Sequence, residues 1–208
     1  MAARTLVGTR HGSGTYVQRV RGTALRKPLQ LFVAQHDVGI ADLFMIRMDL
    51  EGAVGFHAAS QADDQDLDQL HSNLAVTKLV LRQMQRDPKD AAAMEAFAWA
   101  DLSFHQTLAA ATHNPLYEAI LTPFVDTLLE VRRQGVRVAS HTARYAIEDH
   151  EEIYRAILPR NPDQARQLMI RHLARVEAWV PREEPVVPTA KRNGSDTVSP
   201  FEEQEAQP

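Results

Sequence analysis

Apolar residues recur at helical spacing along most of this chain. From about Ile40 onward, apolar positions three and four residues apart form one stripe after another, as they do in amphipathic helices. Proline, asparagine and glycine separate the stripes, and the connections between them are short. The pattern predicts an all-α fold, an antiparallel bundle of about six helices. The expected helices cover approximately residues 40–58, 67–86, 91–111, 115–135, 141–158 and 163–179.

The two ends of the chain have a different pattern. Leu6-Val7 and Thr15-Tyr16-Val17 are strand-like, and Gly12-Ser13-Gly14 supplies a turn between them, which predicts a β-hairpin. The segment that follows has no clear period, and the tail after Pro181 is rich in Pro, Glu, Gln and Ser, which favours disorder. We therefore expect four regions: a hairpin in 1–20, a linker in 21–38, a helical domain in 39–180 and a disordered tail in 181–208.

Composition and charge narrow the class of protein. The chain has 208 residues, enough for one good-sized domain, and no cysteine, which excludes disulfides and thiolate metal sites. No apolar run reaches the ~18 residues of a membrane span and no secretory signal is visible, so we expect a cytoplasmic protein with no membrane partner. The net charge is −4, but residues 1–27 carry six basic and no acidic residues, which leaves −10 on the remainder (−4 − 6). A basic arm on an acidic body suggests contact with a polyanion at one end, and a solvated basic tail is the alternative.

Four polar residues occupy apolar stripes. Asp101 and His105 lie four residues apart, so both side chains point to the same face of the third expected helix. His150 and His172 interrupt the apolar stripes of the fifth and sixth. Three imidazoles and a carboxylate facing the inside of a bundle suit a divalent ion such as zinc, nickel or manganese. The alternatives are hydrogen-bonded core histidines and a simple Asp101–His105 pair within one helix.

Arg47 also falls near the buried face of its helix. A buried guanidinium needs an anionic partner. Glu51, four residues further on, is one candidate within the same helix, and a bound carboxylate ligand is the other.

Several segments, taken in order, resemble the GntR family of bacterial transcriptional regulators, in particular its FadR-type branch with an all-helical effector domain (FCD domain). The hairpin resembles the wing of a winged helix-turn-helix. The other matching segments are Leu43-Phe44-Met45-Ile46-Arg47 with Leu50-Glu51, Asp101-Leu102-Ser103-Phe104-His105 with Asn114-Pro115, and Asp149-His150-Glu151-Glu152-Ile153 with Asp163, Ala165 and His172-Leu173. The resemblance extends from residue 5 to about residue 179.

The resemblance implies a bundle that binds a divalent metal, zinc before nickel or manganese, through Asp101, His105, His150 and His172. It implies a small organic acid effector whose binding alters the affinity for operator DNA, and a homodimer. By analogy, Arg47 and Asn114 would contact the effector. The hairpin residues expected to contact DNA are Arg10, His11 and Ser13.

One feature departs from the family pattern. The recognition helix and the two helices before it should precede the wing, and Met1 leaves no room for them. The hairpin could still contact phosphates, which gives salt-dependent affinity without base readout. Because the wing retains its turn residues, we expect that the given sequence begins after the true start of the protein. The alternative is a sensor that has lost its DNA-reading helices.

Two other functions remain open at this point. A metal site with open positions could activate water in a metal-dependent enzyme acting on a small carboxylate, but no dedicated acid–base pair accompanies the four residues. We therefore expect a regulator and not an enzyme. The third hypothesis is a sensor without DNA-reading helices (a headless sensor) that forms dimers with full-length relatives.

Overall fold

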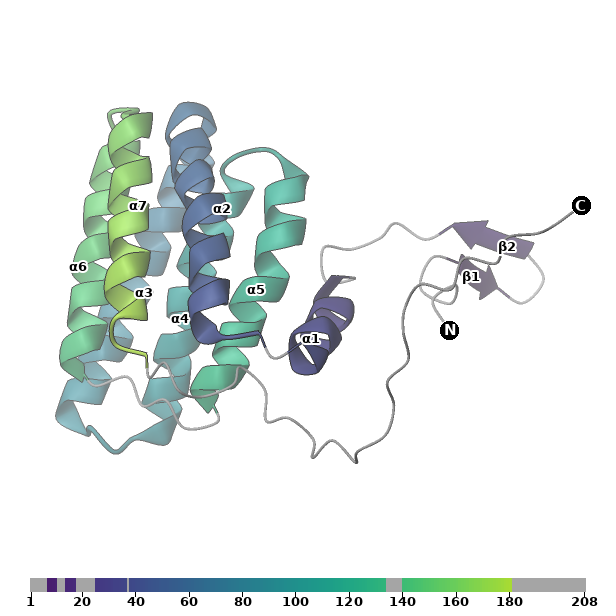
Figure 1. Ribbon diagram of the computed structural model, residues 1–208. Helices are drawn as coiled ribbons and strands as arrows, with labels where there is room; N and C mark the ends of the chain where they lie inside the picture. The colour runs from purple at the N-terminus through teal and green to yellow at the C-terminus, as the bar shows by residue number, and fades with distance from the viewer. Residues whose placement is uncertain (1–6, 11–13, 18–24, 37, 134–139, 181–208) are drawn as a thin grey trace, which may run out of the picture.

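The computed structural model describes residues 7–10, 14–17, 25–36, 38–133 and 140–180. Seven helices lie in this part of the chain, and six of them form one bundle (Figure 1). They are α1 (Arg26–Gln35), α2 (Ile40–Gln61), α3 (Asp64–Arg86), α4 (Ala91–Ala110), α5 (Pro115–Arg133), α6 (Ser140–Ile157) and α7 (Pro162–Glu177). Helices α2 to α7 correspond to the six that the apolar stripes predict, so the all-α helical domain is confirmed.

Helix α1 lies within the segment 21–38, which the sequence predicts to be a linker. It occupies residues 26–35, and Val33 is buried where the helix packs against α5. Pro28 is compatible with the helix because it lies in the first turn, where backbone N–H groups have no partner within the helix. The apolar residues Leu31 and Phe32 of α1 are more than half exposed. Its apolar pattern therefore does not mark one buried face, and the sequence gives little sign of this helix.

Two short strands are the only other regular elements in the described residues. Strand β1 (Val7–Arg10) pairs antiparallel with β2 (Gly14–Val17), with Val7 opposite Val17 and Arg10 opposite Gly14. The turn between them, residues 11–13, lies outside the described residues, and so does the segment 18–24. The tail after Val180, expected to be disordered, also lies outside them.

Polar side chains fix where the helices begin. The Asp63 carboxylate accepts a hydrogen bond from the backbone N–H of Asp66, and the Asp66 carboxylate accepts one from Asp63, both at 2.9 Å. This reciprocal cap starts α3 three residues before the first apolar residue of its stripe, Leu67. Asp90 caps α4 in a similar way, and the Asn161 side chain accepts from Gln164 at the start of α7.

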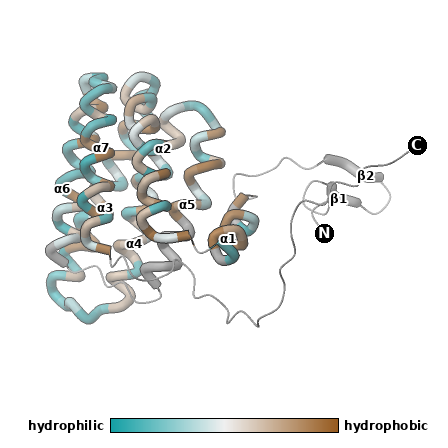
Figure 2. The backbone as a smooth tube through the Cα atoms, viewed as in Figure 1, coloured by the Kyte–Doolittle hydropathy of each residue, from teal (hydrophilic) through white to brown (hydrophobic). Residues whose placement is uncertain are grey.

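The hydrophobic core consists of two clusters, a large one that includes residues of α2, α4 and α7 and a smaller one between α3, α4 and α6. Hydrophobic and hydrophilic residues alternate along α7, as an amphipathic helix requires (Figure 2). Among the side chains of α5 that the structure describes, Leu121, Pro123 and Val125 are buried, whereas Leu116 and Ile120 are exposed. Helical spacing of apolar residues therefore does not identify the buried face of α5, because apolar residues occur on both sides of this helix.

Helices α2 and α7 share the most extensive contact in the bundle (Figure 1). Two glycines of α2 allow it. A Cβ on Gly55 would lie 3.1 Å from the backbone oxygen of Ala165, and a Cβ on Gly52 would lie 3.0 Å from a side-chain carbon of Ile170. The close approach brings the middle of α2 next to the face of α7 that carries His172.

Among the described residues, no helix is both long and apolar enough to cross a membrane.

Candidate metal centre

Three helices bring the predicted polar residues together inside the bundle. Asp101 and His105 come from α4, His150 from α6 and His172 from α7, and all four side chains are buried. One nitrogen of each histidine ring lies within 4.8 Å of a nitrogen of the other two. The structure thus assembles the histidines that the sequence could only place on separate helices.

The ring nitrogens of the site have a consistent orientation. Nε2 of His150 lies 3.2 Å from Nε2 of His172, and 3.7 Å from Oδ1 of Asp101. His105 turns Nδ1 away, toward Glu51, which leaves its Nε2 on the side of the other two rings. The ring of Phe104 stacks on His150 with a centroid distance of 3.9 Å and fixes its plane.

Glu51 is a buried carboxylate beside this cluster. Its Oε1 accepts a hydrogen bond from Nε of Arg47 at 2.5 Å, and its Oε2 contacts Nδ1 of His105. Burial opposes the charge on Glu51, but the charges of Arg47 and His105 and their hydrogen bonds outweigh burial and lower the pKa of Glu51 to about 2. Glu51 therefore stays ionised and faces His105 with a full negative charge.

Asp149 lies in a similar position behind His172. Its Oδ2 is 3.5 Å from Nδ1 of His172, and its Oδ1 accepts hydrogen bonds from Arg175 at 2.9 Å and from Arg171 at 3.3 Å. Burial lowers the pKa of His172 below its ordinary value, although the nearby Asp149 carboxylate acts in the opposite direction. His172 is therefore neutral at physiological pH, the form that binds a metal.

The donor set suits a borderline divalent ion. Neutral imidazoles together with a carboxylate are ligands of zinc and of nickel, and the absence of thiolates disfavours softer ions. Without a cation, several ring nitrogens would face one another in a buried volume, where unpaired polar atoms are costly. The residues present therefore fit the metal that the resemblance implies.

The other predicted residues lie elsewhere or have partners. Arg47 is buried and pairs with Glu51, one of the two partners that the sequence offered. Asn114 is exposed, and its Oδ1 accepts from the backbone N–H of Leu116 at the start of α5. Arg10 lies in β1 at the end next to the turn. His11 and Ser13 lie outside the described residues.

The sequence does not reveal the second contact of Glu51 or the contact of Asp149 with His172. Helical spacing offers Glu51 only as a partner for Arg47 and cannot show that its other oxygen reaches His105 on α4. Asp149 directly precedes His150, which was the one available signal.

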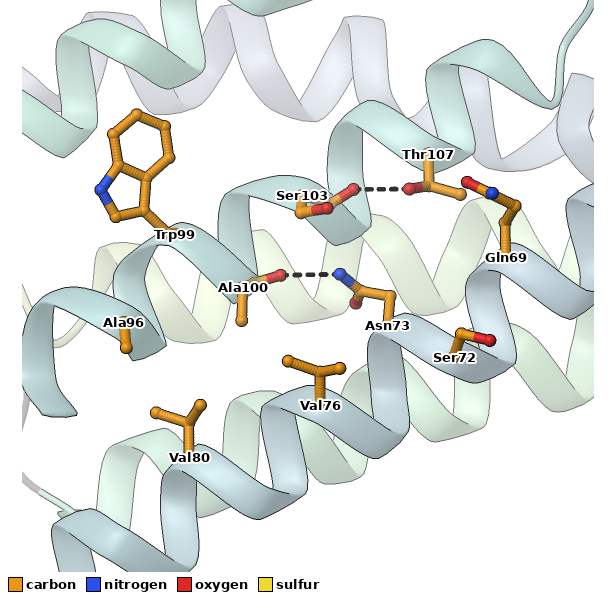
Figure 3. Close-up of a pocket in the computed structure, with 10 residues that line it drawn as sticks. All are labelled: Gln69, Ser72, Asn73, Val76, Val80, Ala96, Trp99, Ala100, Ser103 and Thr107. Carbon is orange, nitrogen blue, oxygen red and sulfur yellow. Dashed lines mark hydrogen bonds between the residues drawn. The ribbon is translucent and has the colours of Figure 1, made fainter.

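Two further features lie apart from the buried cluster. Asp63, Asp66 and His113 form a group near the surface, in which Asp66 is partly buried and His113 Nε2 is 2.8 Å from Asp66 Oδ2. Since the two aspartates already cap α3, this contact fastens the turn before α5 to that helix end. The second feature is a groove of about 530 Å³ between α3 and α4 (Figure 3).

Comparison with known proteins places these observations in a family. The family model described as "FCD domain" matches residues 42–175, which begin in α2 and end in α7. The chain is 27% identical over 181 residues to the HTH-type transcriptional regulator LutR of Bacillus subtilis, with 85% of this chain and 78% of the relative covered. It is 31% identical over 180 residues to the Uxu operon regulator of Haemophilus influenzae, with 83% of this chain covered. The chain spans only 61% of the length of that second relative.

A solved structure agrees in fold. The structure of Streptococcus agalactiae GntR matches with a TM-score of 0.58 and 23% identity, over 86% of this chain and 77% of that one. The two curated relatives are named as regulators, so the chain belongs with regulatory proteins and not with enzymes. Because the family model covers more than half of the sequence, the chain belongs to the FCD-domain family of GntR-type transcriptional regulators.

Proposed function

We propose that this chain is the sensing part of a transcriptional regulator, and that its helical bundle binds one divalent metal ion through Asp101, His105, His150 and His172. The observation that carries the proposal is the convergence of three imidazoles from three helices in one buried cluster, with Oδ1 of Asp101 3.7 Å from Nε2 of His150. Zinc is the first candidate, since it accepts mixed nitrogen and oxygen ligands, and nickel and manganese are the alternatives.

The effector in this proposal is a small organic acid. Four protein ligands leave coordination positions open on an ion that accepts five or six, and a carboxylate can occupy them. Arg47 is a buried cation on α2 beside the histidine cluster, which supports it as a contact for such an acid. Asn114 has weaker support, because it is exposed and caps α5. The proposal therefore assigns the effector contact to Arg47 before Asn114.

The proposal includes contact with operator DNA. The hairpin formed by β1 and β2 would serve as the wing, with Arg10, His11 and Ser13 against the phosphate backbone. Phosphate contacts of this kind bind many sequences with similar, salt-dependent affinity. The effector would act by binding one arrangement of the regulator better than another and so shifting the population that is competent to bind DNA. A cytoplasmic location follows from this role.

The proposal also includes a homodimer. The groove between α3 and α4 is the surface that we assign to the dimer interface. Its walls are Gln69, Ser72, Asn73, Val76, Val80, Ala96, Trp99, Ala100, Ser103 and Thr107, none of which is charged. A two-fold interface brings each patch against its own copy, so an uncharged patch avoids like-charge contacts. Val76 and Trp99 are about half exposed on the walls (Figure 3), and the small residues beside them permit close approach of helices.

The metal content of the purified protein tests the central claim. The protein is prepared without chelator, and bound metal is measured by inductively coupled plasma mass spectrometry beside Asp101→Ala and His172→Ala. About one zinc, nickel or manganese per chain, lost in both variants, is the expected result. His71→Ala is the matched control, because His71 is an exposed histidine of α3 outside the cluster. Absence of metal in the unaltered chain, or equal metal in all four proteins, would refute the site.

The regulatory claim needs a second experiment. The chain, joined to the upstream residues of its gene, is titrated with DNA from near that gene at moderate salt, with and without small carboxylic acids. Sequence-specific binding that an acid alters supports a regulator. If the chain instead abolishes DNA binding by a co-expressed full-length relative, the result supports the headless sensor and not a regulator that binds DNA itself.

A further inference from the structure

The three histidines of the cluster could each bind a metal through either ring nitrogen. What selects the nitrogen in a metal site is the partner of the other nitrogen, on the far side of the ring. Two of the three rings have a buried carboxylate in that place: Glu51 behind His105 and Asp149 behind His172. Neither carboxylate is among the four ligands.

Glu51 is held by a buried cation on its own helix. Arg47 and Glu51 are one turn apart on α2, and the guanidinium donates to Oε1, which leaves Oε2 directed at Nδ1 of His105. Both side chains are almost completely buried, so they have little freedom to choose other partners.

Asp149 is held differently, by two arginines that reach the surface. Arg171 and Arg175 both donate to Oδ1, and their side chains are 46% and 38% exposed, whereas Asp149 is 2% exposed. Arg171 also pairs with Glu152 on the outside of α6. A continuous series of polar contacts therefore runs from the molecular surface through Asp149 to His172.

We propose that Glu51 and Asp149 are positioning residues of the metal site: each accepts the Nδ1 proton of its histidine and so directs Nε2 of that ring to the ion. The inference rests on the metal site proposed above. Outer carboxylates of this kind fix the ring and increase its basicity, and their loss weakens metal binding by about 10- to 100-fold in other sites. Arg171 and Arg175 hold the Asp149 carboxylate that contacts His172. Removal of both arginines should therefore weaken metal binding, by a smaller factor than removal of the Asp149 charge itself.

The test compares charge-removing variants that keep the shape of the side chain. Glu51→Gln and Asp149→Asn are purified, and their zinc affinity is measured by competition with a chromophoric chelator. Cobalt-substituted samples are compared by visible absorption, which reports the coordination geometry of the ion. We expect zinc affinity to fall about 10-fold or more in each variant, with an altered cobalt spectrum. Glu148→Gln is the matched control, because Glu148 is an exposed carboxylate of α6 that pairs with Arg144 and does not contact Arg171, Asp149 or a histidine of the cluster.

The outcomes separate the two proposals. Wild-type protein that binds no metal refutes the metal site itself. Wild-type protein that binds zinc, with Glu51→Gln and Asp149→Asn equal to it in affinity and cobalt spectrum, overturns the positioning role alone. Should a buried variant fail to fold, the double variant Arg171→Gln/Arg175→Gln changes only partly exposed side chains and still tests the Asp149 arm. Unchanged zinc affinity in that variant would contradict the claim that Arg171 and Arg175 position Asp149 behind His172.

Discussion

Nε2 of His150 and Nε2 of His172 face each other at 3.2 Å in the interior of the bundle, although the two residues lie on different helices. Two imidazole nitrogens at this distance either share one proton or both direct lone pairs toward a cation between the helices. A metal ion would therefore join α4, α6 and α7, of which α6 and α7 are also joined by the ion pairs of Arg171 and Arg175 with Asp149. Metal occupancy and bundle stability should be linked.

Removal of the metal should lower the thermal stability of the protein. A ligand at 100 times its dissociation constant adds about 2.7 kcal/mol to the free energy of unfolding. For a domain of this size each kcal/mol corresponds to roughly 2–4 °C, so we expect the melting temperature to fall by roughly 5–10 °C after chelation. Circular dichroism melts with and without EDTA measure the shift. Asp101→Ala should melt at the same temperature in both conditions, and a chelator effect in that variant would place the metal elsewhere.

Much of this site could be predicted from the sequence because its ligands break a strong pattern. Asp101, His105, His150 and His172 each occupy a buried position on an apolar stripe, where a polar group needs a partner, so the sequence indicates either a shared metal ion or hydrogen-bonded core residues. The pattern gives the face of each helix but not the distance between helices. It therefore could not reveal that Glu51 of α2 contacts His105 of α4.

The differences between the predicted and the observed helices have the same physical origin. In α5, Leu116 and Ile120 are apolar yet exposed, so helical spacing alone could not distinguish their face from that of Leu121 and Val125. Helix α1 was missed because it is short and many of its apolar side chains are exposed. Sequence periodicity identifies a buried face only when the opposite face is polar.

Loss of the Arg47 guanidinium should be more damaging than loss of the whole Arg47–Glu51 pair. Arg47→Met leaves an ionised, buried Glu51 with one cation fewer, and breaking a buried pair from one side costs about 3–5 kcal/mol. The double variant Arg47→Met/Glu51→Met removes both charges, and we expect it to recover at least half of that loss. Urea unfolding of the metal-free proteins measures both values. Equal destabilisation in the single and double variants would show that Glu51 depends on other partners.

The low pKa of Glu51 predicts acid sensitivity. Its pKa is about 2 in the folded protein against an ordinary value of 4.5, so the unfolded chain takes up the proton first as the pH falls. The stabilisation from Glu51 is complete above about pH 4.5 and declines as the pH falls toward 2, by up to about 3 kcal/mol. We expect the free energy of unfolding of the metal-free protein to fall between pH 5.5 and 3.5, and to fall less in Glu51→Gln. Parallel pH profiles for the two proteins would contradict the prediction.

The two glycines of α2 should differ in their tolerance of a methyl group. In Gly55→Ala the new Cβ would meet the Ala165 backbone at 3.1 Å, which can move only if α7 moves. In Gly52→Ala it would meet the Ile170 side chain, which can rotate away. We expect Gly55→Ala to destabilise the fold by about 1–3 kcal/mol, and Gly52→Ala to be nearly neutral because alanine favours a helix by about 1 kcal/mol. Chemical denaturation measures both, and the reverse order would mean that the helices are not held at this distance.

A charge placed in the groove between α3 and α4 should prevent self-association. Trp99 is 44% exposed on the wall of that groove, and a two-fold interface would bring two copies of any new charge close together. Sedimentation velocity should therefore find a dimer for the unaltered chain and a monomer for Trp99→Glu. Leu116→Glu is the matched control, because Leu116 is 65% exposed on α5 and does not line the groove. Dissociation by both substitutions, or by Leu116→Glu alone, would assign the dimer interface to another face of the bundle.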